Sequence, residues 1–171
     1  EYPNSLKEIL IICREDDQET IKKVKQTIIE LKQKNIHLVI FNDYPINKPH
    51  ALNLGLKYAH YNTIVVFDAE DLPHPFLYKI ANTLIVRQSL QVLQSGVQLM
   101  NYRSKWFSAL NVLEYFFWFK STMHYFSKQG VIPLGGNTVF FNKNSLKKVK
   151  GWDERCLTED GDIGIRLSVL G

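Results

Sequence analysis

The chain contains few cysteines, no long apolar run and no marked excess of charge. Its 171 residues include only two cysteines, Cys13 and Cys156. Two cysteines exclude a disulfide-rich scaffold, and their separation does not match a metal-binding pair, so we expect two free thiols in a reducing compartment. No run of about 18 apolar residues is present, which excludes a predicted membrane-spanning helix within this sequence. Internal repeats and low-complexity segments are absent as well, which excludes a repeat array.

The charge balance is mildly basic. The sequence carries 21 Lys and Arg against 17 Asp and Glu, a net charge of +4 at pH 7. Its lysines are spread over helix-like segments and lack the dense arginines and interleaved aromatics of a nucleic-acid groove, so we expect no nucleic-acid partner. A basic rim facing an anionic membrane or an anionic ligand is the better interpretation. With 45% hydrophobic and 22% charged residues, the composition is that of one globular domain.

Apolar runs typical of strands alternate with segments of helical periodicity along the whole chain. The expected strands are 6–13, 36–41, 63–66, 92–100 and 138–141; the expected helices follow residue 17, Pro75 and Asn142 or Asn144 and cover 51–59, 106–126 and 158–170. This alternation predicts an α/β fold with a mostly parallel sheet and helices on both faces. Because ligands of such sheets bind beyond the carboxyl ends of the strands, the residues that follow each strand are the first candidates for a site.

An acidic cluster follows the third predicted strand. Asp68 and Glu70 lie two residues apart, so in extended backbone both carboxylates leave the same face. Adjacent carboxylates repel each other unless a cation lies between them, and a divalent metal carrying a phosphorylated ligand is a natural occupant. The alternative is a solvated turn in which Asp71 caps a helix. Asp17 and Asp43 also follow predicted strands, which favours convergence of the acids on one edge of the sheet.

Two further segments carry residues suited to an anionic substrate. Lys48 lies immediately before a predicted helix, where a lysine opposes the helix dipole unless an anion such as a diphosphate is bound nearby. The alternative is a solvated loop lysine. In the second segment, Gly135 and Gly136 precede Asn137, and paired glycines let a substrate approach the backbone closely or form a flexible turn.

A second acidic cluster, Thr158-Glu159-Asp160, opens the last predicted helix. Negative neighbours such as Glu159 and Asp162 are expected to raise the pKa of the Asp160 carboxyl and make it a better general base. The alternative is structural, because Thr158 suits an N-cap and acids in the first turn suit the helix dipole.

The apolar segment 106–126 has two interpretations. Trp106, Leu110, Leu113 and Phe117 recur at helical spacing, which favours burial in the core or an interface. The second interpretation is contact with a membrane surface or a sugar-stacking groove, through the aromatic side chains Tyr115, Trp118 and Tyr125.

Together these motifs resemble a known enzyme family. In order, the chain carries acids after its first strand, Asp43 after its second, Lys48-x-x-Ala51-Leu52-Asn53, Asp68-Ala69-Glu70-Asp71, Gly135-Gly136-Asn137, Gly151-Trp152-Asp153 and Thr158-Glu159-Asp160. This order is similar to that of family 2 glycosyltransferases with the GT-A fold, especially the membrane-associated, cellulose-synthase-like branch. The resemblance implies one catalytic domain over 1–171, with a nucleotide-sugar half up to about residue 100 and an acceptor half beyond it.

The resemblance also implies roles for individual residues. Asp17 and Asp43 would hold uridine, Lys48 would lie near the diphosphate, and Asp68 and Glu70 would bind the diphosphate through Mg²⁺ or Mn²⁺. Asp160 would be the base of an inverting transfer from a UDP-sugar to a hydroxyl acceptor, expected to be a glycan or polysaccharide. The remaining substrate-binding residues would be Gly135, Gly136, Asn137, Trp152 and Glu159.

Some features depart from the family pattern. Its usual Pro-x-Tyr-Asn-Glu is here Cys13-Arg14-Glu15-Asp16-Asp17, so Glu15 or Asp16 is an alternative nucleoside contact, and the Asp-x-Glu variant leaves Glu70 and Asp71 as alternative metal ligands. The Gln-x-x-Arg-Trp motif of processive members is absent, and both ends look cut.

We therefore expect a fragment of a longer membrane protein on the cytoplasmic face of the cell membrane. The alternative functions are a non-catalytic, metal-dependent nucleotide-sugar-binding module and a nucleotidyltransferase. The nucleotidyltransferase would need a basic, glycine-rich loop after the first strand, whereas this chain has Glu15, Asp16 and Asp17 there.

Overall fold

A computed structural model describes residues 2–131 and 133–170 of the chain. The elements follow in the order η1 (Asn4–Leu6), β1 (Ile9–Arg14), α1 (Gln18–Leu31), β2 (Ile36–Phe41), α2 (Lys48–Tyr58), β3 (Thr63–Val66), α3 (Leu77–Gln88), β4 (Val92–Gln94), α4 (Ser108–Phe117), the π-helical turn η2 (Trp118–Thr122), α5 (Met123–Lys128), β5 (Val139–Asn142), α6 (Lys143–Lys148) and α7 (Glu159–Ser168). The predicted α/β class is confirmed.

The strands form two sheets of different character. In the first, β1 and β2 are parallel, with Ile9 opposite Ile36 and Arg14 opposite Phe41. In the second, the order is β3-β5-β4, and β5 is antiparallel to both neighbours. The prediction of a mostly parallel sheet is therefore wrong for the second sheet. Hydrophobic patterns mark where a strand lies and leave its direction undetermined, because direction depends on where the connecting segment returns the chain.

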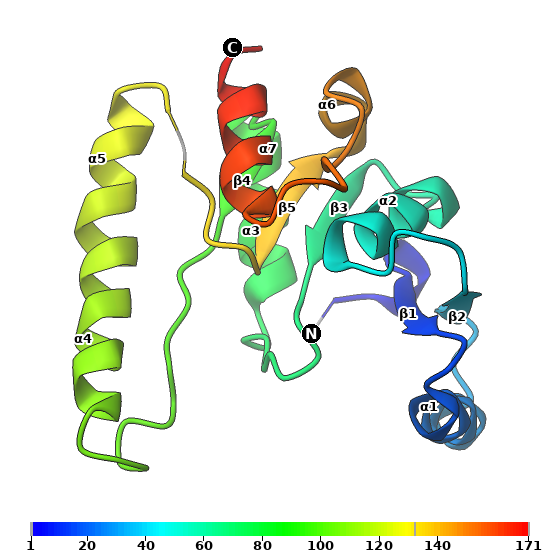
Figure 1. Cartoon of the computed structure of the whole chain (residues 1–171). Coiled ribbons are helices and arrows are strands. Elements are labelled where there is room, and N and C mark those ends of the chain that lie inside the picture. The colour runs from blue at the N-terminus through cyan, green and yellow to red at the C-terminus, as the bar shows by residue number, and fades with distance from the viewer. Residues whose placement is uncertain (1, 132, 171) are drawn as a thin grey trace.

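The excursion between β4 and β5 determines that direction. Gln94, the last residue of β4, pairs with Val139, the first residue of β5, so residues 95–138 leave and re-enter at the same edge of the sheet. The helical part of the excursion is a rod formed by α4, η2 and α5 (Ser108–Lys128), which stands at one side of the molecule, away from the first sheet (Figure 1). The predicted strand 92–100 is correspondingly short, because the chain turns outward after Gln94.

The main core lies around the second sheet. Its buried members are Val66, Leu134, Val139, Phe141, Leu146, Trp152, Ile163 and Leu167. They come from β3 and β5, from α6 and α7, and from the segments that precede β5 and α7, and side chains of α2 pack against them. The start of α2 and the start of α7 are thereby held beside the same sheet, and both carry predicted site residues.

Several local predictions are confirmed with shifted boundaries. β2 and β3 span the predicted ranges, whereas α2 begins at Lys48, three residues before the predicted start. The side chain of Asn47 caps α2 by accepting a hydrogen bond from His50 N at 2.9 Å. Lys48 therefore occupies the first turn of a helix.

Candidate functional site

The antiparallel placement of β5 brings three polar segments to one edge of the second sheet. Val139 pairs with both Val66 and Gln94, so the residues that follow β3 lie beside the loop that precedes β5. The backbone joins them as well, because Thr138 N donates to Val66 O at 2.7 Å. The acidic turn 68–71 and the loop 135–137 are therefore neighbours, although about 65 residues separate them along the chain.

Lys48 links this edge to the first turn of α7. Its Nζ donates a hydrogen bond to Asp68 Oδ1 at 2.8 Å and lies 3.7 Å from Glu159 Oε1. Partial burial lowers the pKa of the Lys48 ammonium, but the bond to Asp68 and the nearby charges of Glu159 and Asp160 outweigh burial and raise it. One cation thus joins α2, the turn after β3 and α7, and a role of Lys48 near a diphosphate stays a prediction.

The side chain of Asp71 stabilises the acidic turn. Its Oδ2 accepts a hydrogen bond from Asp68 N at 2.9 Å, and its Oδ1 accepts one from Asn137 Nδ2 at 3.0 Å. Both oxygens are therefore engaged within the protein. Glu70 is exposed, and within residues 2–131 and 133–170 its side chain has no hydrogen bond or ion pair. Of the two alternative metal ligands, the geometry favours Glu70.

The donor set at this turn fits a divalent cation that brings other ligands with it. Within the described residues, no group of three or more His, Cys, Asp or Glu side chains could enclose a metal ion. Asp68 and Glu70 offer carboxylate oxygens, which Mg²⁺ and Mn²⁺ prefer, and Mg²⁺ commonly takes one or two carboxylates together with substrate phosphates. Asp68 already holds a cation in the form of the Lys48 ammonium. These residues fit a metal held jointly with a diphosphate, and they do not fit an all-protein metal cage.

Asp160 lies in the first turn of α7, against Gly136. A Cβ placed on Gly136 would lie 3.0 Å from Asp160 Oδ2, and Gly136 has φ of +77°. Both the backbone conformation and the contact therefore require glycine. Within the described residues the group that lies against Gly136 is Asp160, and the close approach of a substrate stays a prediction. Asp160 Oδ1 accepts a hydrogen bond from Gly161 N at 2.8 Å.

Sequence reasoning missed Gln94, which positions the loop before β5. Its Oε1 accepts a hydrogen bond from Gly135 N at 2.9 Å, and its Nε2 donates to Asn137 O at 3.0 Å. The side-chain amide thus holds both ends of the tripeptide that carries Gly136. The available signal was a polar residue at the end of an otherwise apolar strand.

Asn53 fixes the segment that leads to α7. It accepts from Trp152 N at 2.9 Å, donates to Trp152 O at 2.8 Å, and donates to Glu154 Oε1 at 2.9 Å. The Trp152 ring is buried and packs edge-on against Phe141, with centroids 5.7 Å apart. The ring therefore belongs to the core, because the apolar surface of β5 receives it. Trp152 also lines the cavity, described below, that Lys48 and Asp68 line, so its binding of substrate stays a prediction.

His50, which the sequence analysis did not single out, lies between two carboxylates. Its Nε2 is 3.3 Å from Asp43 Oδ2 and its Nδ1 is 3.1 Å from Glu154 Oε2, while the ring itself is buried. Burial lowers the pKa of His50, but Glu154 and Asp43 outweigh it and raise the pKa above its ordinary value. The same contact lowers the pKa of Asp43. Asp43 is therefore tied to α2, two residues from Lys48.

The acids after β1 have local partners. Asp17 caps α1 by accepting from Thr20 N at 3.1 Å, and this bond lowers the pKa of its exposed carboxyl. Glu15 Oε2 accepts from Asn42 Nδ2 at 2.8 Å, and Asp16 pairs with Arg14. The structure thus links Asp43 to Lys48 through α2, whereas the carboxylate of Asp17 bonds only its own helix among the hydrogen bonds of the described residues.

A cavity of about 840 Å³ adjoins the Lys48–Asp68 pair. Both residues line it together with apolar residues of β1 and β3, whose facing edges have no strand partner in the described chain. Its walls are mostly apolar and carry the charged side chains of Lys48 and Asp68. Such a lining suits a ligand with a flat apolar part and an anionic part.

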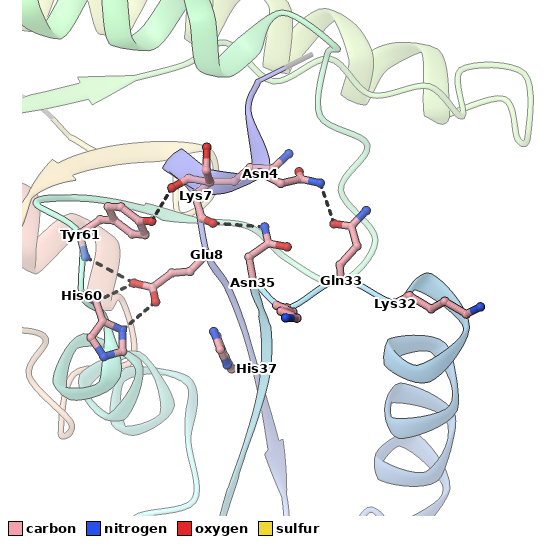
Figure 2. A pocket seen from close by; sticks show the side chains of 11 residues that line it. Asn4, Lys7, Glu8, Lys32, Gln33, Asn35, His37, His60 and Tyr61 are labelled. Atoms are coloured by element: carbon pink, nitrogen blue, oxygen red, sulfur yellow. Dashed lines mark hydrogen bonds and ion pairs between the residues drawn. The ribbon is translucent and has the colours of Figure 1, made fainter.

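A second pocket, of about 550 Å³, lies at the start of β1 and shares Lys7, Glu8 and Tyr61 with the larger cavity (Figure 2). Its acid, Glu8, accepts from His60 N at 2.6 Å and lies 2.8 Å from His60 Nδ1. Tyr61 OH donates to Ser5 O at 3.0 Å. These contacts tie the start of β1 to the approach of β3, so Glu8 and His60 have a structural role.

Comparisons with known proteins identify two relatives of this chain. The chain is 26% identical over 172 residues to a beta-monoglucosyldiacylglycerol synthase from Nostoc sp. (strain PCC 7120); the match covers 98% of this chain and 36% of that protein. The fold is similar, with a TM-score of 0.75 at 19% identity, to a mannosyltransferase from Pyrobaculum calidifontis solved with GDP-Man and Mn²⁺, covering 100% of this chain and 45% of that one. The chain thus spans less than half the length of these relatives.

The similarity of structure confirms the predicted GT-A fold. A family model described as glycosyltransferase-like family 2 matches residues 1–171, the whole sequence. The chain therefore belongs to glycosyltransferase-like family 2.

Proposed function

We propose that this chain is the catalytic domain of an inverting glycosyltransferase that moves a sugar from a UDP-sugar to a hydroxyl acceptor. The observation that carries the proposal is the convergence of a cation and two sets of acids from separate elements. Lys48 bonds to Asp68 and lies near Glu159, and Asp160 stands beside Gly136. A donor that leaves as a nucleoside diphosphate needs positive charge, and its acceptor needs a base, and these residues can supply both.

In the proposed reaction, Asp160 takes the proton of the acceptor hydroxyl. The acceptor oxygen then forms a bond to the anomeric carbon while the bond from that carbon to the diphosphate oxygen breaks, so the configuration inverts. Lys48 neutralises charge on the diphosphate as it leaves. Asp68 and Glu70 would hold Mg²⁺ or Mn²⁺, which supplies further charge neutralisation when bound.

The relatives support parts of this proposal. The Nostoc relative is named for a glucosyl lipid, and the Pyrobaculum structure contains GDP-Man and Mn²⁺. We propose UDP as the nucleotide, as the family resemblance implies, with a glycan or lipid hydroxyl as the acceptor. We also propose that Asp17 or Glu15, together with Asp43, contacts the nucleoside, and that the domain works at the cytoplasmic face of the cell membrane.

Replacement of Asp160 by Asn in the full-length protein tests the proposal. We expect transfer to fall by about 10² to 10⁴-fold, as for loss of a general base, while UDP binding with Mn²⁺ in a titration stays near that of the wild type. Glu30→Gln is the matched control, because Glu30 is an exposed acid on α1 whose side chain bonds only to Gln26 among the described residues. Unimpaired transfer by Asp160→Asn would refute the assignment of the base.

Assays of the wild-type protein distinguish the proposed transferase from a binding module and identify the nucleotide of the donor. Binding of UDP with no transfer by the wild-type protein, over a panel of UDP- and GDP-sugars, would favour a non-catalytic nucleotide-sugar-binding module. Turnover of GDP-sugars alone would contradict the choice of UDP and leave the role of Asp160 standing.

A further inference from the structure

The rod presents an apolar stripe to solvent. Trp106, Leu110, Leu113 and Phe117, which we call the outward stripe, are exposed by 84%, 57%, 52% and 60%. They recur at helical spacing along one side of α4 and the turn before it. No segment of the described residues covers them, and Figure 1 shows the rod at the edge of the molecule. A contiguous exposed apolar surface of this kind marks an interaction site.

The opposite side of the rod faces the protein. Ser108, Phe119 and Met123 are buried there, and a Cβ on Gly135 would lie 3.0 Å from Phe119 Cζ. The prediction of burial in the core is therefore wrong for the outward stripe, because the rod packs through Phe119 on the loop that carries the site; burial in an interface stays a prediction. The outward stripe remains available to a partner outside the described chain.

The charges around the stripe are mostly positive. Between residues 103 and 128 the exposed cations are Arg103, Lys105, Lys120 and Lys128, and Glu114 is the sole acid. Aromatic side chains with polar edges, Trp106 and Tyr125, lie toward the two ends of the segment and are exposed. Apolar and aromatic residues flanked by cations are typical of a helix that lies in the interface of an anionic membrane.

We propose that the outward stripe docks on the surface of an anionic lipid bilayer, with the rod lying in the plane of the membrane. In the described part of the chain, no helix has both the length and the apolarity needed to cross a bilayer. Docking would bury the four apolar side chains and place the cations near anionic headgroups, and both contributions strengthen binding. This proposal does not depend on sugar transfer.

Docking also has a consequence for the site. Phe119 of the rod lies against Gly135, and the neighbouring Gly136 faces Asp160. The loop 135–137 beside the proposed base therefore contacts the rod directly. Docking would thus place this loop one helix diameter, about 10 Å, from the membrane surface.

Vesicle flotation of the 171-residue chain tests the proposal. We expect the chain to float with vesicles of phosphatidylcholine and phosphatidylglycerol, to bind pure phosphatidylcholine vesicles less, and to lose binding as salt increases. The variants Leu113→Glu and Phe117→Glu should each lower vesicle partitioning about 10-fold or more. The matched control is Ile29→Glu, since Ile29 is an apolar residue on α1 that is even more exposed than Leu113 and Phe117. Circular dichroism confirms that each variant folds.

Three results would overturn the proposal. One is absence of flotation by the folded wild-type chain, and another is equal flotation by the stripe variants and the control. The third is a concentration-dependent dimer that dissociates in Phe117→Glu while flotation is unchanged, because a second copy would then be the partner of the stripe. None of these results bears on Asp160, so they can be distinguished from failure of the proposed transferase activity.

Discussion

The candidate site and the rod differ in whether their side chains find partners within the chain. At the site, Lys48 pairs with Asp68 and Asp71 bonds to Asn137, so polar groups find partners across three segments of the same chain. On the rod, the outward stripe exposes apolar side chains that no described segment covers. Buried polar groups must be paired within the fold, whereas exposed apolar groups can be left for an external partner. The difference identifies one region as pre-assembled and the other as a contact surface.

The largest expected effect comes from comparing two leucine-to-alanine variants, one in the core and one on the outward stripe. Leu146→Ala in the core should lower the free energy of unfolding by about 3 kcal/mol, because Leu146 is fully buried and its loss leaves a cavity. Leu113→Ala on the outward stripe should change it by about 0.5 kcal/mol or less. Urea denaturation followed by circular dichroism measures both. An equal loss for Leu113→Ala would show that the stripe is packed in solution and would break the comparison.

A pair of glycine substitutions sharpens the account of the site. Gly136 and Gly130 both have φ of +77°, but a Cβ at Gly130 meets nothing within 4 Å, whereas one at Gly136 would crowd Asp160. Each Ala variant should lose about 1 kcal/mol of stability from backbone strain. Only Gly136→Ala should also lower transfer in the full-length protein, by about 100-fold, because the base is displaced. Equal transfer activities of Gly136→Ala and Gly130→Ala would contradict a role of Asp160 in the reaction.

The Asn53 contacts give the next largest effect. Asn53→Ala removes hydrogen bonds to both main-chain groups of Trp152 and should cost about 2 kcal/mol of folding free energy. Asn144→Ala is the control, since Asn144 is exposed at the start of α6. Thermal and urea unfolding compare them, and similar losses would mean that the Asn53 contacts do not hold the segment before α7.

The smallest effect concerns His50 and depends on pH. The folded-state pKa of His50 is raised, so its pairing with Asp43 and Glu154 contributes fully below the unfolded pKa and is lost as pH rises through the folded one. The pKa values of both carboxyls are lowered, so the contribution also fades as pH falls and they become protonated. His50→Gln should therefore cost more stability at about pH 5.5 than at about pH 8.5.

The control for His50 is His37→Gln. His37 is exposed on β2 and has no ion pair with any described residue, so its replacement should change stability little at either pH. A loss for His50→Gln that is independent of pH would mean that the ring acts through packing against Phe41 and not through its charge.

Much of the fold was predictable because its signals are local. Apolar runs located β2 and β3 within their observed ranges, and Asn142 caps α6 as one of the two expected caps. Boundaries were less predictable where a single cap decides them, as at Asn47 before α2. The rod was predicted as a helix, but which side is buried depends on what the rod packs against, and the sequence pattern favoured the wrong side.

The residues of the candidate site also differ in how far the sequence predicts them. Lys48, Asp68 and Asp160 were predictable because charged residues at strand ends and helix starts oppose local electrostatics or repel one another. Gln94 and His50 were not, because an isolated polar residue has no pattern and acquires a role only through partners far along the chain.

The sequence by itself determined the α/β class, the position of most elements and the residues that carry the candidate chemistry, since each depends on neighbours within a few positions. Tertiary structure alone decided the direction of β5, which brings the loop with Gly136 to the edge where the acidic turn lies. It also decided which side of the rod faces solvent, because burial depends on contacts between segments that are distant in sequence.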